Sequence, residues 1–329
     1  MVFMMELLKE LWFTRRDLVS DGFDHALAHI SKIIPLHIHK IPTGTRAWTW
    51  IVPKKWSVKN ASIENTKGKR VLDLKNHPLH VASYSLPVNK IVSREELLKH
   101  IRTKPERPNA IPYDFKFYQR DWGFCIAHKR LKKLTDSRYK AVINSKFEKG
   151  TLKIGDFTIK GATDNVIAII SHLDHPAMAN DDLSGVAVAV ELAKTLKKQK
   201  NNYTFKFLFL PETIGSVAYL SQNEKLIPKV KYALFLEMLG HNDIHSLQLS
   251  RQGNTKIDRI AHSVMKRMLP KFREDGFRKI VRNDEMVWNG PGVNIPTISI
   301  SRADYEPTHY PEYHTSDDTL KIISSKRLY

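Results

Sequence analysis

The chain has 329 residues, 42% of them hydrophobic, which is enough for one main domain with an elaboration. No uninterrupted apolar run approaches the ~20 residues of a membrane-spanning helix, so we expect no membrane partner. The one cysteine, Cys125, excludes internal disulfides and cysteine-rich zinc modules, and its isolation is typical of a cytoplasmic protein.

The formal net charge of +19 raises the question of an anionic partner. Lysines occur singly or in pairs, as at 54–55, 132–133 and 197–198, rather than in one block. The sequence also has no helix-turn-helix, zinc-finger or RNA-binding aromatic motif. We therefore expect the charge to be spread over solvated faces and predict no specific nucleic-acid partner. Nucleic-acid binding driven by charge alone is the alternative.

The N-terminal region 2–34 is predicted to be helical, with a break near 20–22. Glu6, Lys9 and Glu10 lie among its apolar residues, which favours an amphipathic helix over a signal peptide. Short β-type runs separated by turn-rich segments come next, at 48–52, 70–74 and 80–84. They predict a small β-rich insert. We therefore divide the chain into a core of residues 1–48 and 109–329 and an insert of residues 49–108.

Strands then alternate with helices. Apolar runs without polar alternation, typical of strands buried on both faces, occupy 166–170, 205–210, 232–236 and 293–300. Helical spacing is found at 184–199 and 255–268. This order predicts an α/β fold of the phosphorylase/hydrolase-like type, in which a mixed, mostly parallel sheet is covered by helices.

An acidic, histidine-rich loop follows the first of these strands and carries His172, Asp174, His175 and Asp181. The next two strands each end in a carboxylate, at Glu212 and Glu237, and His314 lies in the loop after the last strand. Open α/β sheets place their ligands at the carboxyl ends of the strands, so we expect these side chains to meet at one edge.

Histidines and carboxylates together are the ligands expected for zinc or a similar divalent ion. The set suffices for one ion, or for two ions ~3.5–4 Å apart that share a bridging carboxylate. Such ions polarise a carbonyl oxygen and lower the pKa of a bound water. Metal-assisted hydrolysis of an amide bond, in a peptide or a small amide substrate, is therefore the predicted reaction class.

Four segments resemble the metal-binding signatures of M28-type zinc aminopeptidases, namely 172–174, 180–185, 236–240 and 314–318. Others are similar to the DUF4910/DUF2172 type of that group, namely 50–56, 79–85, 121–125, 211–216 and 311–315. Members of this type carry a small β-rich domain inserted in the peptidase core, and they are often encoded among polysaccharide-biosynthesis functions. Fuller members continue into a winged-helix-like region, which this chain, ending soon after His314, is expected to lack.

The resemblance implies that Asp181 is the bridging carboxylate. It also implies that Glu212 and His314 belong to one ion, while Glu237 and a histidine of the first loop belong to the other. His172 fits the general peptidase pattern at that last position, and His175 fits the pattern of the subfamily. Both alternatives stay open.

The identity of the general base is a second open point, because the usual pattern has two adjacent glutamates where this chain has Pro211 and Glu212. Glu212 is either the base or a ligand, and in the second case Asp284 or Glu285 is the nearest substitute. We therefore take Glu212 and Glu285 as candidate catalytic residues and Asp284 as a candidate contact of the substrate's amino group. Asp174 is expected to orient a ligand histidine by a hydrogen bond.

Three functions follow from these predictions. The first is a zinc-dependent aminopeptidase, for which a homo-oligomer is one possible assembly. The second is a deacylase or amidohydrolase that acts on an amino-sugar or amino-acid conjugate with the same site. The third is a catalytically idle metal-binding module, which the proline before Glu212 favours.

Overall fold

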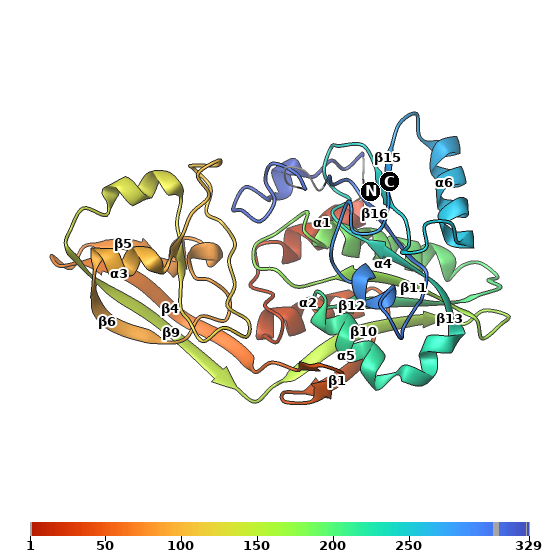
Figure 1. Cartoon of the computed structure of the whole chain (residues 1–329), viewed down its shortest axis with the longest axis horizontal. Helices are drawn as coiled ribbons and strands as arrows, with labels where there is room; N and C mark the ends of the chain where they lie inside the picture. The colour runs from red at the N-terminus through yellow and green to blue at the C-terminus, as the bar shows by residue number, and fades with distance from the viewer. Residues whose placement is uncertain (1, 305–308, 327, 329) are drawn as a thin grey trace.

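The computed structural model describes residues 2–304, 309–326 and 328. An eight-stranded mixed sheet forms the centre of the larger part of the molecule (Figure 1). Its strands, in spatial order, are β1 (His37–Pro42), β10 (Thr151–Ile159), β12 (Thr204–Leu210), β11 (Val166–His172), β13 (Val230–Leu236), β16 (Thr297–Ser301), β14 (Ser246–Gln248) and β15 (Arg273–Asp275). The four central strands β12, β11, β13 and β16 run parallel to one another. Their carboxyl ends therefore lie at one edge, as predicted.

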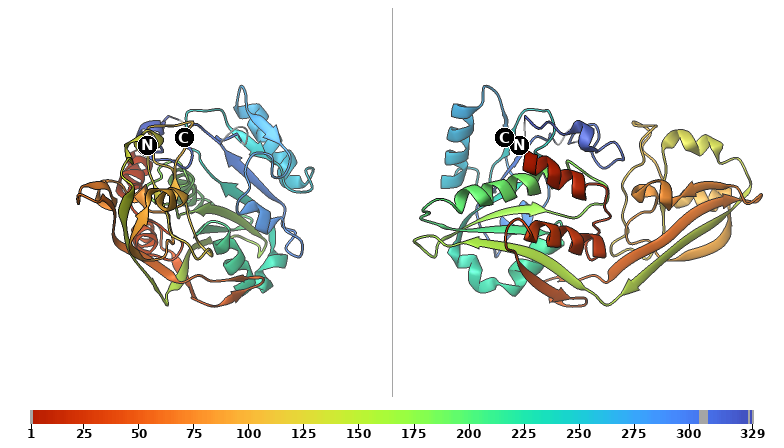
Figure 2. Two further views of the ribbon diagram at one scale, coloured as in Figure 1. Left: turned by 60° about the vertical axis from the view of Figure 1, so that its left-hand side comes forward. Right: turned by 180° about the vertical axis from the view of Figure 1, so that it is seen from behind.

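Helices cover both faces of this sheet, as the views from two sides show (Figure 2). They are α1 (Val2–Leu11), α2 (Asp21–Ser31), α4 (Leu183–Leu196), α5 (Ile214–Gln222), α6 (Lys256–Met268) and α7 (Glu285–Trp288). Ile169 and Phe207 pack with α1, α2 and α4 in one apolar cluster, whereas Ile170 and Leu208 pack with α5 in another. Residues next to each other in a strand point to opposite faces, and burial of both faces explains the unbroken apolar runs in the sequence.

A second sheet of four strands forms the smaller part of the molecule. Its strands, in spatial order, are β5 (Arg70–Asp73), β4 (Lys55–Asn65), β9 (Arg138–Glu148) and β6 (Val88–Ser93). The Ser93 side chain caps the helix α3 (Arg94–Lys99). Two short sheets add β2 (Arg46–Ala47) with β3 (Trp50–Ile51), and β7 (Ile101–Arg102) with β8 (Phe124–Cys125). Because β9 lies beyond residue 108, the predicted insert range omits one strand of this sheet. The domain boundary itself stays a prediction.

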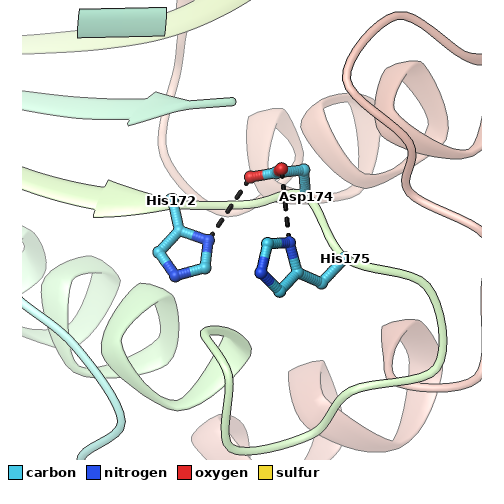
Figure 3. Close-up of side chains that lie close together, drawn as sticks. All are labelled: His172, Asp174 and His175. Atoms are coloured by element: carbon cyan, nitrogen blue, oxygen red, sulfur yellow. Dashed lines mark hydrogen bonds and ion pairs between the residues drawn. The ribbon is translucent and has the colours of Figure 1, made fainter. Parts of the chain in front are cut away.

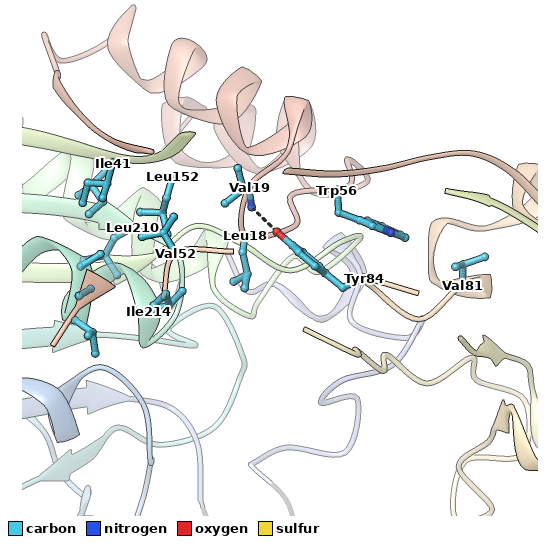
Figure 4. Close-up of a cluster of buried hydrophobic side chains, with 14 of the residues drawn as sticks. Leu18, Val19, Ile41, Val52, Trp56, Val81, Tyr84, Leu152, Leu210 and Ile214 are labelled. Atoms are coloured by element: carbon cyan, nitrogen blue, oxygen red, sulfur yellow. Dashed lines mark hydrogen bonds between the residues drawn. The ribbon is translucent and has the colours of Figure 1, made fainter. Parts of the chain in front are cut away.

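One apolar core joins the two parts (Figure 4). It runs from Leu210 and Ile214 of the larger part to Trp56 and Tyr84 of the smaller part. The Tyr84 hydroxyl accepts a hydrogen bond of 3.1 Å from the backbone N–H of Val19. Because the core is continuous, the second sheet has a fixed position beside the carboxyl ends of the central strands.

Two predicted elements differ from the structure. Residues 80–84 form no strand, because the short helix η2 (Pro78–His80) ends there and only isolated bridges at Val81 and Ser83 follow. The helical N-terminal region is broken earlier and for longer than predicted, from residue 12 to residue 20. Among the described residues, no helix combines the length and the apolar character that crossing a membrane requires.

A buried ion network on the sheet leads to a prediction about stability. Asp156 of β10 lies 2.7 Å from Lys206 Nζ and 3.0 Å from His39 Nε2. Burial alone would raise the pKa of Asp156, but hydrogen bonds and the charge of its partners lower it from 3.8 to about 2. A lowered pKa means that the ionised carboxylate stabilises the fold above pH ~4 and that this contribution is lost as the pH falls towards ~2.

We therefore expect Asp156→Asn to lower the free energy of unfolding by about 2 to 3 kcal/mol at pH 7. Urea unfolding at pH 7 and at lower pH measures this, and the difference between the variant and the wild type should shrink below pH ~4. Asp164→Asn is the matched control, since that carboxylate is 82% exposed. An Asp156 variant as stable as this control would contradict the prediction.

Candidate metal centre

His172 and His175 come from the end of β11 and the loop after it, and Asp174 lies between them (Figure 3). One carboxylate oxygen of Asp174 faces His172 Nδ1 and the other faces His175 Nδ1, each at 3.3 Å. A carboxylate placed in this way fixes the orientation and tautomer of a ligand histidine. The Nε2 atom of each ring makes no contact with Asp174 and is available to a metal. This geometry is the one expected if Asp174 orients a ligand histidine, as the sequence predicted.

The carboxylate of Asp181 faces the Nε2 atoms of three histidines. Its Oδ1 lies 3.0 Å from His172, and its Oδ2 lies 3.0 Å from His314 and 3.7 Å from His175. Two groups of possible ligands share Asp181, and within each group the ligand atoms all lie within 4.8 Å of one another. The first group is His175, Asp181 and His314, and the second is His172, Asp181 and Glu237.

The two histidines of the first loop therefore do not compete for one position. His172 lies with Glu237, as the general peptidase pattern implied for one ion. His175 lies with His314, where the sequence placed Glu212. We refer to these five residues, His172, His175, Asp181, Glu237 and His314, as the Asp181 cluster.

Four atoms of this cluster are buried and make no hydrogen bond of normal geometry with any described residue. They are His172 Nε2, Asp181 Oδ2, Glu237 Oε2 and His314 Nε2. Buried polar atoms without partners cost free energy, and buried charges are normally paired or coordinate a metal. Imidazole nitrogens together with carboxylate oxygens form a donor set that zinc prefers. The residues present thus fit a zinc-like divalent ion.

Burial and crowding of like charges shift the pKa values of the cluster. Burial, with the charges of Asp182 and Asp181, raises the pKa of Glu237 well above its usual range. Burial alone would lower the pKa of His172, but the carboxylates of Asp174 and Asp181 raise it well above its usual range. A divalent cation bound here would offset the repulsion among these acids.

Side chains next to the cluster hold the backbone that carries Asp181. The carboxylate of Asp318 accepts hydrogen bonds from the backbone N–H groups of residues 179 to 181, at 2.7 to 3.2 Å. Asp182 caps α4 through Gly185 N and also accepts from Met238 N, next to Glu237. A Cβ at Gly185 would lie 2.5 Å from Leu236 O, so this position requires glycine for α4 to approach β13.

Arg16 holds the first loop from its inner side. This arginine is fully buried, and its partners among the described residues are carbonyl and hydroxyl oxygens; Nε donates to Leu173 O at 2.9 Å and Nη2 donates to Met178 O at 3.0 Å. Its remaining nitrogen donates to Leu11 O at 2.5 Å. The guanidinium therefore ties both ends of the segment that contains His175 to the end of α1.

Backbone strain is concentrated at the cluster. His175 has φ 84° and His314 has φ 53°, and the residues that follow Glu212 and Glu237 have φ 58° and 52°. Non-glycine residues seldom adopt positive φ, and they do so mainly where the surrounding structure imposes it. The backbone at the ends of three strands and in the C-terminal loop thus adopts unusual conformations beside the residues of the Asp181 cluster.

Comparison with known proteins places the chain in a family. The model of the "Domain of unknown function (DUF4910)" matches residues 5–329. The chain belongs to the DUF4910 family. A Clostridium acetobutylicum protein, whose name gives it an aminopeptidase-like domain and a role in polysaccharide biosynthesis, is 36% identical over 98% of this chain and 73% of its own length.

Solved structures share the fold of this DUF4910 protein. The structure of a C. acetobutylicum protein named as a peptidase superposes with a TM-score of 0.93 at 35% identity, over 99% of this chain and 76% of that one. The zinc aminopeptidase BSAP of Bacillus subtilis gives 0.73 at 14% identity, over 99% and 91%. A peptidase M28 precursor from Shewanella amazonensis gives 0.65 at 15% identity, over 100% and 90%. The predicted fold, that of the M28 aminopeptidases, is confirmed.

Glu212 of this DUF4910 protein lies beside the Asp181 cluster. Its Oε2 is 3.4 Å from His175 Nε2, its side chain is 25% exposed, and its backbone N–H donates to Asp174. Burial raises the pKa of this carboxyl group to about 7, although His175 acts in the opposite direction. It belongs to neither ligand group that shares Asp181. The geometry therefore favours Glu212 as a proton-transfer group over Glu212 as a ligand.

Asp284 and Glu285 occupy supporting positions. Asp284 accepts a hydrogen bond of 3.1 Å from Thr213 N. The two oxygens of Glu285 accept from Gln248 Nε2 at 3.1 Å and from Asn283 N at 2.9 Å, so the structure does not bring this carboxylate into the cluster. The side chain of Asn283 in turn donates to Glu237. The substrate contact of Asp284 and the catalytic role of Glu285 stay predictions, and the second is the weaker of the two.

Proposed function

We propose that this protein is a zinc-dependent aminopeptidase, which hydrolyses the amide bond after an N-terminal residue of a peptide or small amide. One observation carries the proposal: His172, His175, His314 and Glu237 surround a single buried carboxylate, Asp181, and four atoms of this cluster make no hydrogen bond of normal geometry with a described residue. The name of the C. acetobutylicum relative and the fold shared with zinc aminopeptidases support it.

The Asp181 cluster would hold one ion or a pair. His175 and His314 belong to one position, His172 and Glu237 to the other, and Asp181 to both. A divalent ion bound there would polarise the carbonyl oxygen of the substrate and lower the pKa of a water molecule. The chain's own contribution is to fix the ligands, through Asp174 for the two rings of the first loop and through Asn283 for Glu237.

Glu212 is the group that we assign to proton transfer. Its Oε2 lies beside the cluster, its side chain is partly open to solvent, and it belongs to neither of the two possible ligand groups that share Asp181. In the proposed reaction Oε2 takes a proton from the attacking water and passes it to the nitrogen of the departing amine. Asp284 lies behind the same turn, where it fixes the backbone at Thr213.

Glu212→Gln is expected to lower kcat by ~10²–10⁴-fold while the protein keeps its full metal content, because an amide cannot accept the proton but leaves the ligands in place. Steady-state kinetics with an aminoacyl-anilide and elemental analysis of the same sample measure both quantities. Glu224→Gln is the control and should retain activity, because Glu224 is an exposed acid that accepts a hydrogen bond from the ring nitrogen of Trp48. Loss of metal in Glu212→Gln would make Glu212 a ligand and contradict the assignment.

A substrate screen tests the proposed function against its rivals. Aminoacyl-anilides and N-acyl amino sugars are offered in parallel to the zinc-loaded protein. Turnover of the anilides supports the aminopeptidase, and turnover of the N-acyl sugars alone would replace it by a deacylase. Full zinc binding with no turnover of any amide would instead establish an idle metal-binding module.

A further inference from the structure

Four large apolar side chains are exposed on two segments near the first loop. Trp50 is 37% exposed, Ile51 57%, Phe115 41% and Tyr118 55%, and we call them the apolar patch. Three of them, with Thr49, line a hollow of about 330 Å³. Single exposed apolar residues are ordinary, but several that line one hollow are typical of a binding surface. Phe115 lies outside the hollow, on the same segment as Tyr118.

Direct contacts hold the two segments of the patch together. The Tyr118 hydroxyl donates a hydrogen bond of 2.7 Å to Ile51 O. The rings of Tyr118 and Trp50 lie edge to face, with their centroids 6.2 Å apart. Trp50 and Ile51 form β3, and the hairpin of β2 and β3 packs on α5. The residue two positions before α5 is Glu212, so the patch and the proposed proton-transfer group lie on neighbouring elements.

A row of aromatic rings connects the patch to the Asp181 cluster. The ring of Tyr113 lies 4.9 Å from the ring of His175 and 5.1 Å from that of His314. Phe115 follows at 5.7 Å from Tyr113, and Phe117 stacks on Phe115 at 4.3 Å. Tyr113 and Phe115 are two residues apart, and the contact between their rings places both on one side of the segment. The exposed face of Phe115 therefore continues the surface that Tyr113 forms against the ligand histidines.

The charged residues of the same segment do not neutralise the apolar character of this surface. Asp114 and Lys116 alternate with the aromatic residues, and so they point to the other side of the chain. There Lys116 lies 3.2 Å from Asp121 and Asp114 lies 3.5 Å from Arg102. A ligand that reaches the patch meets rings and an isoleucine side chain, while Asp114 and Lys116 have ion-pair partners of their own.

We propose that the apolar patch binds an apolar, preferably aromatic, group of the amide substrate whose scissile bond lies at the Asp181 cluster. This inference rests on the proposed function, because it places the remainder of the same substrate. It names a substrate class: amides with a bulky apolar group beside the bond that is cleaved. Whether that group belongs to the acyl part or to the departing amine is decided by the two arms of the experiment.

The experiment uses the zinc-loaded full chain with the dipeptides Phe-Gly, Gly-Phe and Gly-Gly. We expect the KM of one aromatic dipeptide to be about tenfold lower than that of Gly-Gly, since a buried ring contributes roughly that much to binding. Phe115→Gln should remove this difference and leave kcat, and the KM of Gly-Gly, within about twofold. Preference for Phe-Gly assigns the patch to the acyl part, and preference for Gly-Phe assigns it to the amine.

Ile91→Gln is the matched control, because Ile91 is 59% exposed on β6 of the second sheet and outside the patch. The proposal is overturned if Phe115→Gln and Ile51→Gln behave like this control, or if they raise the KM of all three dipeptides equally. Calorimetric binding of the same dipeptides separates the two levels of inference. If no dipeptide is hydrolysed, the proposed function is contradicted. The proposed binding role of the apolar patch is contradicted as well if the aromatic dipeptides bind no more tightly than Gly-Gly.

Discussion

Replacing Asp181 by alanine is expected to remove metal binding and activity together. This carboxylate is the only residue that the ligand group of His175 and His314 has in common with the group of His172 and Glu237, and it faces three imidazole nitrogens at 3.0 to 3.7 Å. Without it each group keeps two ligands, and a zinc site needs three or four. We expect kcat/KM to fall by at least ~10³-fold, which corresponds to about 4 kcal/mol of transition-state stabilisation.

Elemental analysis and steady-state kinetics of one preparation measure this effect. Asp317→Asn is the matched control, since Asp317 lies in the loop of His314 but pairs with Arg107, and its side chain is 39% exposed. The control should keep both metal and activity. An Asp181→Ala protein that folds, binds zinc at the wild-type ratio and retains activity would contradict the role of Asp181.

The second large effect is expected at Arg16, far from the ligands in sequence. Arg16→Met removes the donors to Leu173 O, Met178 O and Leu11 O, all in the interior. Leu11 O keeps a hydrogen bond of 2.7 Å from the Thr14 hydroxyl, but Leu173 O and Met178 O lose the donor that Arg16 provides. A buried carbonyl left without a partner costs about 1 to 3 kcal/mol, so the free energy of unfolding should fall by roughly 2 to 6 kcal/mol. The loop that carries His175 loses its inner support, and zinc affinity should fall by about 10–100-fold, as for other groups that support ligands.

Urea unfolding and zinc titration of the same variant measure the two effects. Arg70→Met is the control: its guanidinium pairs with Glu64 and Asp73 but is 52% exposed, and we expect no measurable change. Arg16→Lys keeps the charge and should recover little, because an ammonium cannot reach all three carbonyls in the geometry of a guanidinium. Normal stability of Arg16→Met would show that the loop does not depend on this contact.

The mostly parallel sheet and the meeting of the candidate ligands at one edge could be predicted because both leave a local pattern. Val166–His172 reads as an apolar run followed by histidine and aspartate, and Glu212 and Glu237 each follow a run of the same kind. Parallel strands bring such ends to one edge, whatever the distance along the chain. The sequence did not distinguish the positions of His172 and His175, since their separation depends on the strained backbone at His175, which no periodicity reveals.

Apart from Asp174, the supporting residues could not be predicted, because their function lies in contacts between distant segments. Arg16 bonds carbonyls about 160 positions away in the sequence, at 157 and 162 residues. Asn283 precedes Asp284 and Glu285, which we selected as candidates from the sequence. It is nevertheless the side-chain amide of Asn283 that donates a hydrogen bond to Glu237. The insert boundary at 108 missed β9, because that strand returns to the second sheet after a long excursion and pairs with β4 and β6.

Anomalous diffraction at the zinc edge, from crystals of the zinc-loaded protein, tests the central claim most directly. The account predicts anomalous density against Asp181, with one peak at His175 and His314 and, if a second ion binds, another at His172 and Glu237. Glu212 should lie beside the peaks and outside the coordination sphere. Crystals without anomalous density at Asp181, or with zinc bound only elsewhere on the chain, would contradict the account.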